Sequence, residues 1–204
     1  MPVRQLLLLP QTKYLLYGVL ALPFVWLIWA LFHDALGANP AEALSRATGD
    51  WTLRLLCVVL AVTPMRRLTG LSELIRFRRS IGLACFYYAC LHLLCYAWFD
   101  QSFEVNEIVK DLVKRPFIWL GMICFVLMLP LALTSHNAAV RWLGGKRWQQ
   151  LHKWVYVLPV FALLHFYWMR AGKNNFAEVW VYLAILSGLL LSRLWFKLNN
   201  IRVG

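Results

Sequence analysis

Two histidines lie deep inside apolar segments of the chain, where ionisable side chains are rare. His92 follows Ile81 by eleven residues, and His165 follows Lys153 by twelve. With ~1.5 Å of helix rise per residue, each imidazole would lie roughly 16–18 Å into a bilayer, counted from the same side. An unpaired polar group in hydrocarbon costs several kcal/mol, so residues of this kind usually serve a function. The matching depths predict that the two rings act on one ligand.

Neutral imidazole is a good ligand for iron in a membrane, because it offers a nitrogen lone pair without adding a charge. Helix bundles hold such cofactors in their interiors. We therefore predict that His92 and His165 are the axial ligands of a b-type haem. None of the five cysteines belongs to a C-x-x-C-H motif, so axial ligands alone would hold this haem. The alternative is that each histidine only hydrogen-bonds a neighbouring helix.

A third histidine lies closer to the predicted membrane edge. His152 precedes His165 by thirteen residues, about 20 Å along an ideal helix. It is a candidate ligand of a second haem, or a contact for a flavin or quinone. A second haem would need another ligand at the depth of His152. The residue at that depth before His92 is Arg79, thirteen positions earlier, and arginine does not ligate iron. His136 is therefore the candidate for this second ligand. One haem and two haems both stay open.

The elements that must position these residues are membrane helices. The chain has 204 residues, of which 61% are hydrophobic and 15% charged, against ~45–50% and ~25% in ordinary soluble domains. Six apolar segments have about the length needed to cross a bilayer, ~17–25 residues, and predict six spans. The shorter segments can be lengthened, because flanking Lys and Arg side chains can reach the membrane interface. We expect an all-α, polytopic six-helix transmembrane bundle that forms a single domain over residues 1–204. The spans are expected at about 14–32, 50–65, 80–99, 117–134, 151–169 and 176–194.

Basic residues gather on one side of these six spans. That side holds fourteen of the 21 Lys and Arg residues but only one of the nine acids, Glu73. By the positive-inside rule, both termini are expected on the cytoplasmic side of the membrane. Lipid headgroups account for most of this charge, and nucleic acid is not an expected partner. Four of these basic residues are also candidates for binding a flavin phosphate: Arg78, Arg79, Lys146 and Arg147.

Several motifs occur in a characteristic order along the chain. They are Leu60-Ala61-Val62-Thr63-Pro64, Arg78-Arg79-Ser80-Ile81-Gly82-Leu83 continuing to Leu91-His92-Leu93, Lys114-Arg115-Pro116, Leu131-Ala132-Leu133-Thr134-Ser135, and Leu143-Gly144-Gly145-Lys146-Arg147-Trp148-Gln149-Gln150-Leu151-His152 continuing to His165. From about Tyr14 to Phe196 the chain resembles the MsrQ (YedZ) family of the ferric reductase-like transmembrane superfamily. The basic turn followed by two histidines is the most specific part of this resemblance.

The resemblance implies a haem-binding, electron-transferring subunit with haem b and FMN as cofactors. It would take electrons from the quinone pool or a cytoplasmic flavin reductase and pass them to MsrP. MsrP is a periplasmic molybdopterin enzyme that reduces methionine sulfoxide in oxidised envelope proteins, so this chain would not be the catalytic subunit. The family's histidines carry over to His92, His152 and His165. Two-haem relatives in the wider superfamily have a second histidine on the third helix, where this chain has Arg79.

Two other functions stay open from the residues alone. A self-sufficient transmembrane ferric or quinone reductase would need an outer substrate pocket, and the predicted outer loops at 35–50 and 101–114 are short and acidic. A haem-free transporter or assembly factor would use the same histidines to relay protons. Haem content and dependence on a partner protein distinguish the three functions.

Overall fold

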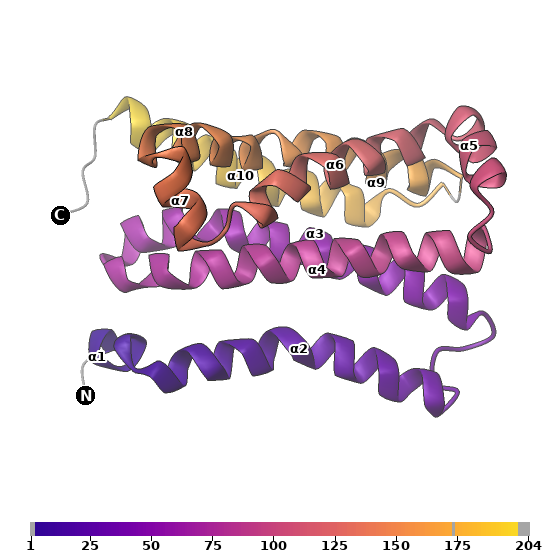
Figure 1. Ribbon diagram of the computed structural model, residues 1–204, viewed down its shortest axis with the longest axis horizontal. Helices are drawn as coiled ribbons and strands as arrows, with labels where there is room; N and C mark the ends of the chain where they lie inside the picture. The colour runs from indigo at the N-terminus through magenta and orange to yellow at the C-terminus, as the bar shows by residue number, and fades with distance from the viewer. Residues whose placement is uncertain (1–2, 173, 200–204) are drawn as a thin grey trace. The chain divides into compact units, whose positions relative to one another are not determined.

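The regular secondary structure of the described residues is helical throughout. The computed structural model describes residues 3–172 and 174–199 (Figure 1). The α-helices are α1 (Val3–Leu8), α2 (Pro10–Phe32), α3 (Pro40–Thr69), α4 (Arg78–Cys95), α5 (Val105–Lys114), α6 (Pro116–Leu133), α7 (Asn137–Leu143), α8 (Gly145–His152), α9 (Leu158–Ala171) and α10 (Ala177–Leu198). The short segments η1 (Ser72–Phe77) and η3 (Lys153–Tyr156) are 3-10 helices, and η2 (Tyr96–Asp100) is a π-helical turn. Within the described part of the chain, the predicted all-α class is confirmed.

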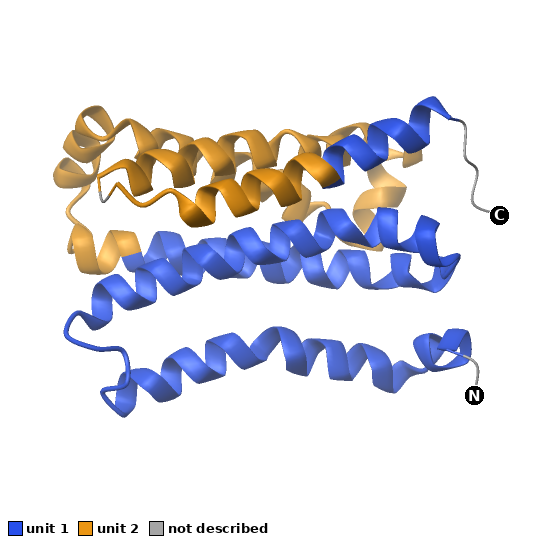
Figure 2. Ribbon diagram, turned by 180° about the vertical axis from the view of Figure 1, so that it is seen from behind, with its two compact units in different colours: residues 1–95, 189–204 blue, residues 96–188 orange. Residues whose placement is uncertain are grey.

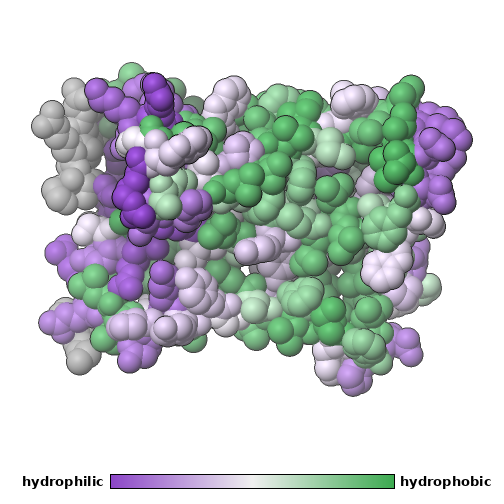
Figure 3. Space-filling model, viewed as in Figure 1, coloured by the Kyte–Doolittle hydropathy of each residue, from purple (hydrophilic) through white to green (hydrophobic). Residues whose placement is uncertain are grey.

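Four helical segments among the described residues are long and apolar enough to cross a membrane. They are Pro10–Phe32, Ser72–Asp100, Pro116–Leu133 and Ala177–Leu198. Figure 3 shows apolar residues along the middle of the helices and hydrophilic residues towards their ends. The protein is therefore a multi-pass membrane protein. A count of six spans stays a prediction, because it also needs α3, which carries several charges, and α9, which has only 14 residues.

The chain forms two compact units (Figure 2). Unit 1 runs to Cys95 and resumes at Leu189, and unit 2 is Tyr96–Gly188, so the boundary falls inside α10. In unit 1, α3 packs along α4, and α2 contacts both. In unit 2, α6 packs along α9, and α5 and α8 contact α6. Each unit is thus built around one helix pair, and the prediction of a single domain stays a prediction.

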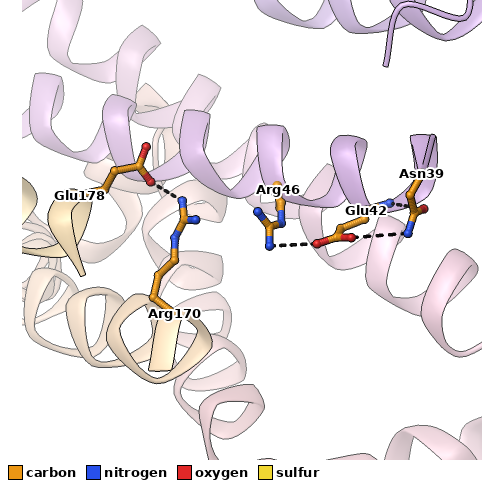
Figure 4. Close-up of polar contacts among 5 residues, drawn as sticks. All are labelled: Asn39, Glu42, Arg46, Arg170 and Glu178. Carbon is orange, nitrogen blue, oxygen red and sulfur yellow. Dashed lines mark hydrogen bonds and ion pairs between the residues drawn. The ribbon is translucent and has the colours of Figure 1, made fainter. Parts of the chain in front are cut away.

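The start of α3 differs from the predicted second span. The sequence placed residues 35–50 in an outer loop, but α3 begins at Pro40, ten residues before the predicted span. The side chain of Asn39 accepts a hydrogen bond from the backbone N–H of Glu42 at 3.1 Å, and Glu42 pairs with Arg46 at 2.9 Å (Figure 4). A proline in the first turn needs no N–H partner, so capping and helical charge pairing extend this helix beyond its apolar stretch.

The predicted outer loop at 101–114 is also largely helical, because it contains α5. Asp111 of this helix is only 8% exposed, and its carboxylate accepts hydrogen bonds from Tyr96 at 3.0 Å and from Gln101 at 2.9 Å. The same carboxylate pairs with Arg115, immediately before α6. Three donors compensate the burial of this charge. Asp111 therefore ties η2 and α5 to the start of α6.

The predicted fifth span is divided in the structure. The sequence indicated one helix over 151–169, whereas α8 ends at His152, η3 follows, and α9 begins at Leu158. Pro159 lies in the first turn of α9, where its missing N–H costs nothing, but it cannot donate to the preceding turn. His152 and His165 consequently belong to different α-helices.

A hydroxyl group from α4 contacts the backbone of α2 beside a proline. Pro23 has no N–H and cannot donate to the hydrogen-bond ladder of α2. Phe24 N–H donates to the Tyr88 hydroxyl at 3.0 Å, and this hydroxyl donates to the Leu20 carbonyl at 3.0 Å, so Tyr88 bridges two backbone groups of α2. The bridge fixes α2 to α4 within unit 1.

Tyr88→Phe is expected to destabilise the detergent-solubilised protein by about 1–3 kcal/mol, because it removes the partner of two partly buried backbone groups. A thermal unfolding curve measures this loss. Tyr87→Phe is the control, since the neighbouring Tyr87 side chain is 65% exposed. Equal melting temperatures for the two variants would show that the bridge contributes nothing.

Candidate functional site

His92 of α4 lies against the backbone of α3. Its Nδ1 is 2.8 Å from the carbonyl oxygen of Ser45. One turn further along α3, Gly49 lies directly beside the ring. A Cβ atom at Gly49 would come within 3.0 Å of the imidazole Cε1 and 3.1 Å of Nδ1. The edge of the ring therefore occupies space that any side chain at Gly49 would fill.

His165 of α9 lies against α6 in the same way. Its Nδ1 is 2.6 Å from the carbonyl oxygen of Phe117. Gly121, one turn further along α6, lies beside the ring, and a Cβ atom there would come within 2.9 Å of Cε1 and 3.1 Å of Nδ1. The two helix pairs thus repeat one arrangement, consisting of a carbonyl, a glycine four residues later and a histidine from the packed helix.

This arrangement determines which ring nitrogen can bind a metal. A carbonyl oxygen only accepts hydrogen bonds, so Nδ1 of His92 and of His165 carries the hydrogen. In that neutral tautomer the lone pair is on Nε2, the usual ligand atom of a histidine whose other nitrogen is held by a carbonyl. Each unit therefore contains one oriented imidazole whose chemistry fits a haem iron.

His152 is organised differently. Its Nε2 is 2.9 Å from the hydroxyl oxygen of Thr134, and that hydroxyl donates its only hydrogen to the Pro130 carbonyl at 2.7 Å. Nε2 of His152 is therefore the donor. Trp148 stacks on the ring at 4.0 Å between centroids and donates its indole N–H to the Thr134 carbonyl at 2.9 Å. His152 therefore carries its hydrogen on Nε2, whereas His92 and His165 carry it on Nδ1.

His136 caps a helix. Its Nδ1 accepts a hydrogen bond from the backbone N–H of Ala139 at 3.1 Å, at the N-terminus of α7. The lone pair of Nδ1 is thus used for capping, and the neutral ring carries its hydrogen on Nε2. His136 thus has a local capping contact, and its role as a substitute haem ligand stays a prediction.

The four basic candidates for a flavin phosphate are divided between the two units. Arg78 and Arg79 open α4 in unit 1, with Arg78 partly buried and Arg79 exposed. Lys146 and Arg147 lie exposed in the first turn of α8 in unit 2. Neither unit brings all four together.

Among residues 3–172 and 174–199, no three His, Cys, Asp or Glu residues form a group that could hold a metal ion, but haem needs only one nitrogen on each face.

Sequence reasoning did not identify Gly49 or Gly121. Glycine inside a helix is unfavourable by about 1 kcal/mol relative to alanine, so a glycine within a predicted span is a usable signal of close approach. That signal was available for Gly121, inside the apolar run of α6. It was not available for Gly49, because the sequence placed this residue in a loop.

Comparisons with known proteins identify the family of the chain. Residues 48–164 match the model of the family described as "Ferric reductase like transmembrane component". The chain is 58% identical to a protein-methionine-sulfoxide reductase heme-binding subunit MsrQ of Polaromonas naphthalenivorans, over 93% of this chain and 86% of that protein. MsrQ proteins of Herminiimonas arsenicoxydans and Caulobacter vibrioides are 51% and 42% identical, over 90% and 89% of this chain and 84% and 87% of their own lengths.

No solved structure matches the chain. The identity to these relatives extends over nearly the whole sequence, and the family match includes His92 and both glycines of the repeated arrangement. The chain therefore belongs to the ferric reductase-like transmembrane family and, within it, to the MsrQ heme-binding subunits.

Proposed function

We propose that this chain carries electrons through a b-type haem whose axial ligands are His92 and His165. The observation that supports the proposal is the repeated arrangement, in which each Nδ1–H is held by a carbonyl at 2.8 or 2.6 Å and the lone pair is left on Nε2. The haem, when bound, supplies a reversible one-electron carrier. His92 and His165 would both bind its iron and leave no open position, which favours electron transfer over oxygen chemistry.

The protein's contribution is to hold the two imidazoles neutral and correctly turned. Donation from Nδ1–H to a carbonyl raises the basicity of Nε2 and prevents the ring from rotating. A neutral ligand also avoids the cost of a charge in the apolar interior. These two helix pairs therefore prepare the ligands before the cofactor binds.

The names of the relatives guide the choice of partner. Each is called a heme-binding subunit of a protein-methionine-sulfoxide reductase. We infer that this chain delivers electrons to MsrP, the periplasmic molybdopterin subunit, in a bacterial inner membrane with both termini cytoplasmic. The donor would be the quinone pool or a cytoplasmic flavin reductase, with FMN as a second cofactor. The concentration of Lys and Arg at one predicted side of the spans supports this orientation.

His152 is proposed as a relay on the electron-entry side rather than as an equal of the two ligands. Its Nε2–H donates to Thr134, so a ligand bond from that nitrogen would require the contact to break. A ring with one nitrogen donating and the other carrying a lone pair can pass a proton to or from a quinol or flavin. The second haem, which the sequence left open, would compete with this arrangement.

His92→Ala and His165→Ala are each expected to abolish haem retention in purified protein, because the iron loses one of its two axial ligands. A pyridine haemochrome assay, normalised to protein, measures the loss. His33→Ala is the matched control, since His33 is exposed and its ring contacts the Trp29 carbonyl and the Trp29 ring of the preceding helical turn. A normal Soret band in either of the first two variants would disprove the axial pair.

His152→Ala is expected to keep its haem but to be reduced roughly tenfold more slowly by a quinol or a reduced flavin, in line with the usual effect of losing a supporting group. Stopped-flow absorbance at the haem band measures the rate. Unchanged kinetics would remove His152 from the entry path, and loss of half of the haem would instead make it a ligand of a second haem.

Reconstitution tests the whole function. The purified chain, reduced by quinol or flavin, should transfer electrons to MsrP and support reduction of a methionine sulfoxide peptide. Reduction of ferric citrate without MsrP, at a rate equal to that with it, would favour the self-sufficient reductase. Protein without any Soret band would favour the haem-free transporter or assembly factor.

A further inference from the structure

The two glycines that touch the candidate ligands differ from other helical glycines in this chain. A Cβ atom at Gly49 or Gly121 would come within 3.1 Å of an imidazole nitrogen, whereas at Gly18 of α2 and Gly188 of α10 it would meet nothing within 4 Å. Glycine is the poorest helix former after proline, and an alanine would be favoured by about 1 kcal/mol at a position without contacts. The contact with histidine is what Gly49 and Gly121 have in common.

The spacing of carbonyl and glycine explains the contact. In an α-helix the side chain of residue i+4 points back towards the carbonyl of residue i. In α3 itself, Thr48 shows this directly, because its hydroxyl donates to the Leu44 carbonyl at 2.8 Å. One residue further along, Gly49 has no side chain beside the Ser45 carbonyl, and the imidazole of His92 takes that place. The same relation holds for Gly121, Phe117 and His165.

A carbonyl oxygen has two lone pairs, so it can accept the imidazole N–H as well as a bond of its own helix. The glycine makes this second lone pair accessible to a ring from the packed helix. Without that access, the Nδ1–H group would have to face lipid or another side chain. Together, the carbonyl, the glycine and the histidine are therefore sufficient to orient an imidazole between two packed helices.

We propose that Gly49 and Gly121 are positioning residues that set the reduction potential of the haem by controlling the hydrogen bond of each ligand. This inference rests on the proposed ligation by His92 and His165. The Nδ1–H bond to a carbonyl makes Nε2 a stronger electron donor to iron, which stabilises the ferric state. A methyl group at either glycine pushes the ring edge outwards, lengthens this bond and makes the haem easier to reduce.

The experiment compares Gly49→Ala and Gly121→Ala with the control variants Gly18→Ala and Gly188→Ala in full-length protein in detergent. We expect the first two to raise the reduction potential, with a roughly tenfold increase in the ratio of reduced to oxidised haem at a fixed potential, or ~59 mV for one electron. Their ferrous haem should also bind carbon monoxide, which a firmly held second ligand prevents. The two controls should match the wild-type protein in potential and in carbon monoxide binding.

Potentials and carbon monoxide spectra of Gly49→Ala and Gly121→Ala equal to those of the controls would overturn the proposal while leaving haem ligation intact. Loss of the proposed function would be seen separately, as wild-type protein without haem or as His92→Ala with a normal Soret band. The two failures are therefore distinguishable.

A measurement on the wild-type protein covers the case in which an alanine variant does not fold. In ferric protein labelled with 15N-histidine, the two ligand imidazoles should each show an Nδ1–H resonance that exchanges slowly with D2O, because the hydrogen is bonded to a carbonyl away from water. Ligation through Nδ1, or rapid exchange at both rings, would overturn the proposal without any variant.

Discussion

The structure depends on how a polar ring finds a hydrogen-bond acceptor inside a membrane. Helices already use nearly all of their backbone groups internally, and hydrocarbon offers none. Each ring instead donates to a backbone carbonyl that a glycine leaves accessible. The Nδ1–O distance is 2.8 Å from His92 to Ser45 and 2.6 Å from His165 to Phe117. In each helix pair, the histidine of one helix lies against a glycine of the other.

The tight approach at each glycine explains other features of the two units. In unit 1, α3 must extend well before its apolar stretch so that Ser45 and Gly49 are helical, and the Asn39 cap with the Glu42–Arg46 pair makes this possible. In unit 2, Phe117 lies in the first turn of α6, and the buried Asp111 fixes that turn through its pair with Arg115. Polar interactions near the helix starts thus help to hold the turns that present the Ser45 and Phe117 carbonyls.

Much of this could be predicted from the sequence, because apolar length and the depth of a histidine are both properties of one helix. The helical class and the four long apolar segments were predicted in this way, and the roles of His92 and His165 were proposed from it. The start of α3 was not, since its first turns contain Glu42 and Arg46 and look like a polar loop in a hydropathy pattern. The break between α8 and α9 was not predicted either, because the apolar pattern continues through it, although Pro159 lies in the first turn of α9. Gly49 was inaccessible to such reasoning, because a glycine in a predicted loop gives no signal of close approach between helices.

The tautomers separate the histidines by the chemistry they can perform. At His92 and His165 the acceptor is a carbonyl, which never donates, so the hydrogen stays on Nδ1 and the lone pair on Nε2. At His152 the acceptor is the Thr134 hydroxyl, which can reverse its hydrogen bond if it releases the Pro130 carbonyl. A ring held by an irreversible acceptor suits a permanent metal ligand. A ring whose acceptor can also donate a hydrogen bond suits a group that exchanges protons. A backbone carbonyl as acceptor therefore favours a metal ligand, and a side-chain hydroxyl favours a proton relay.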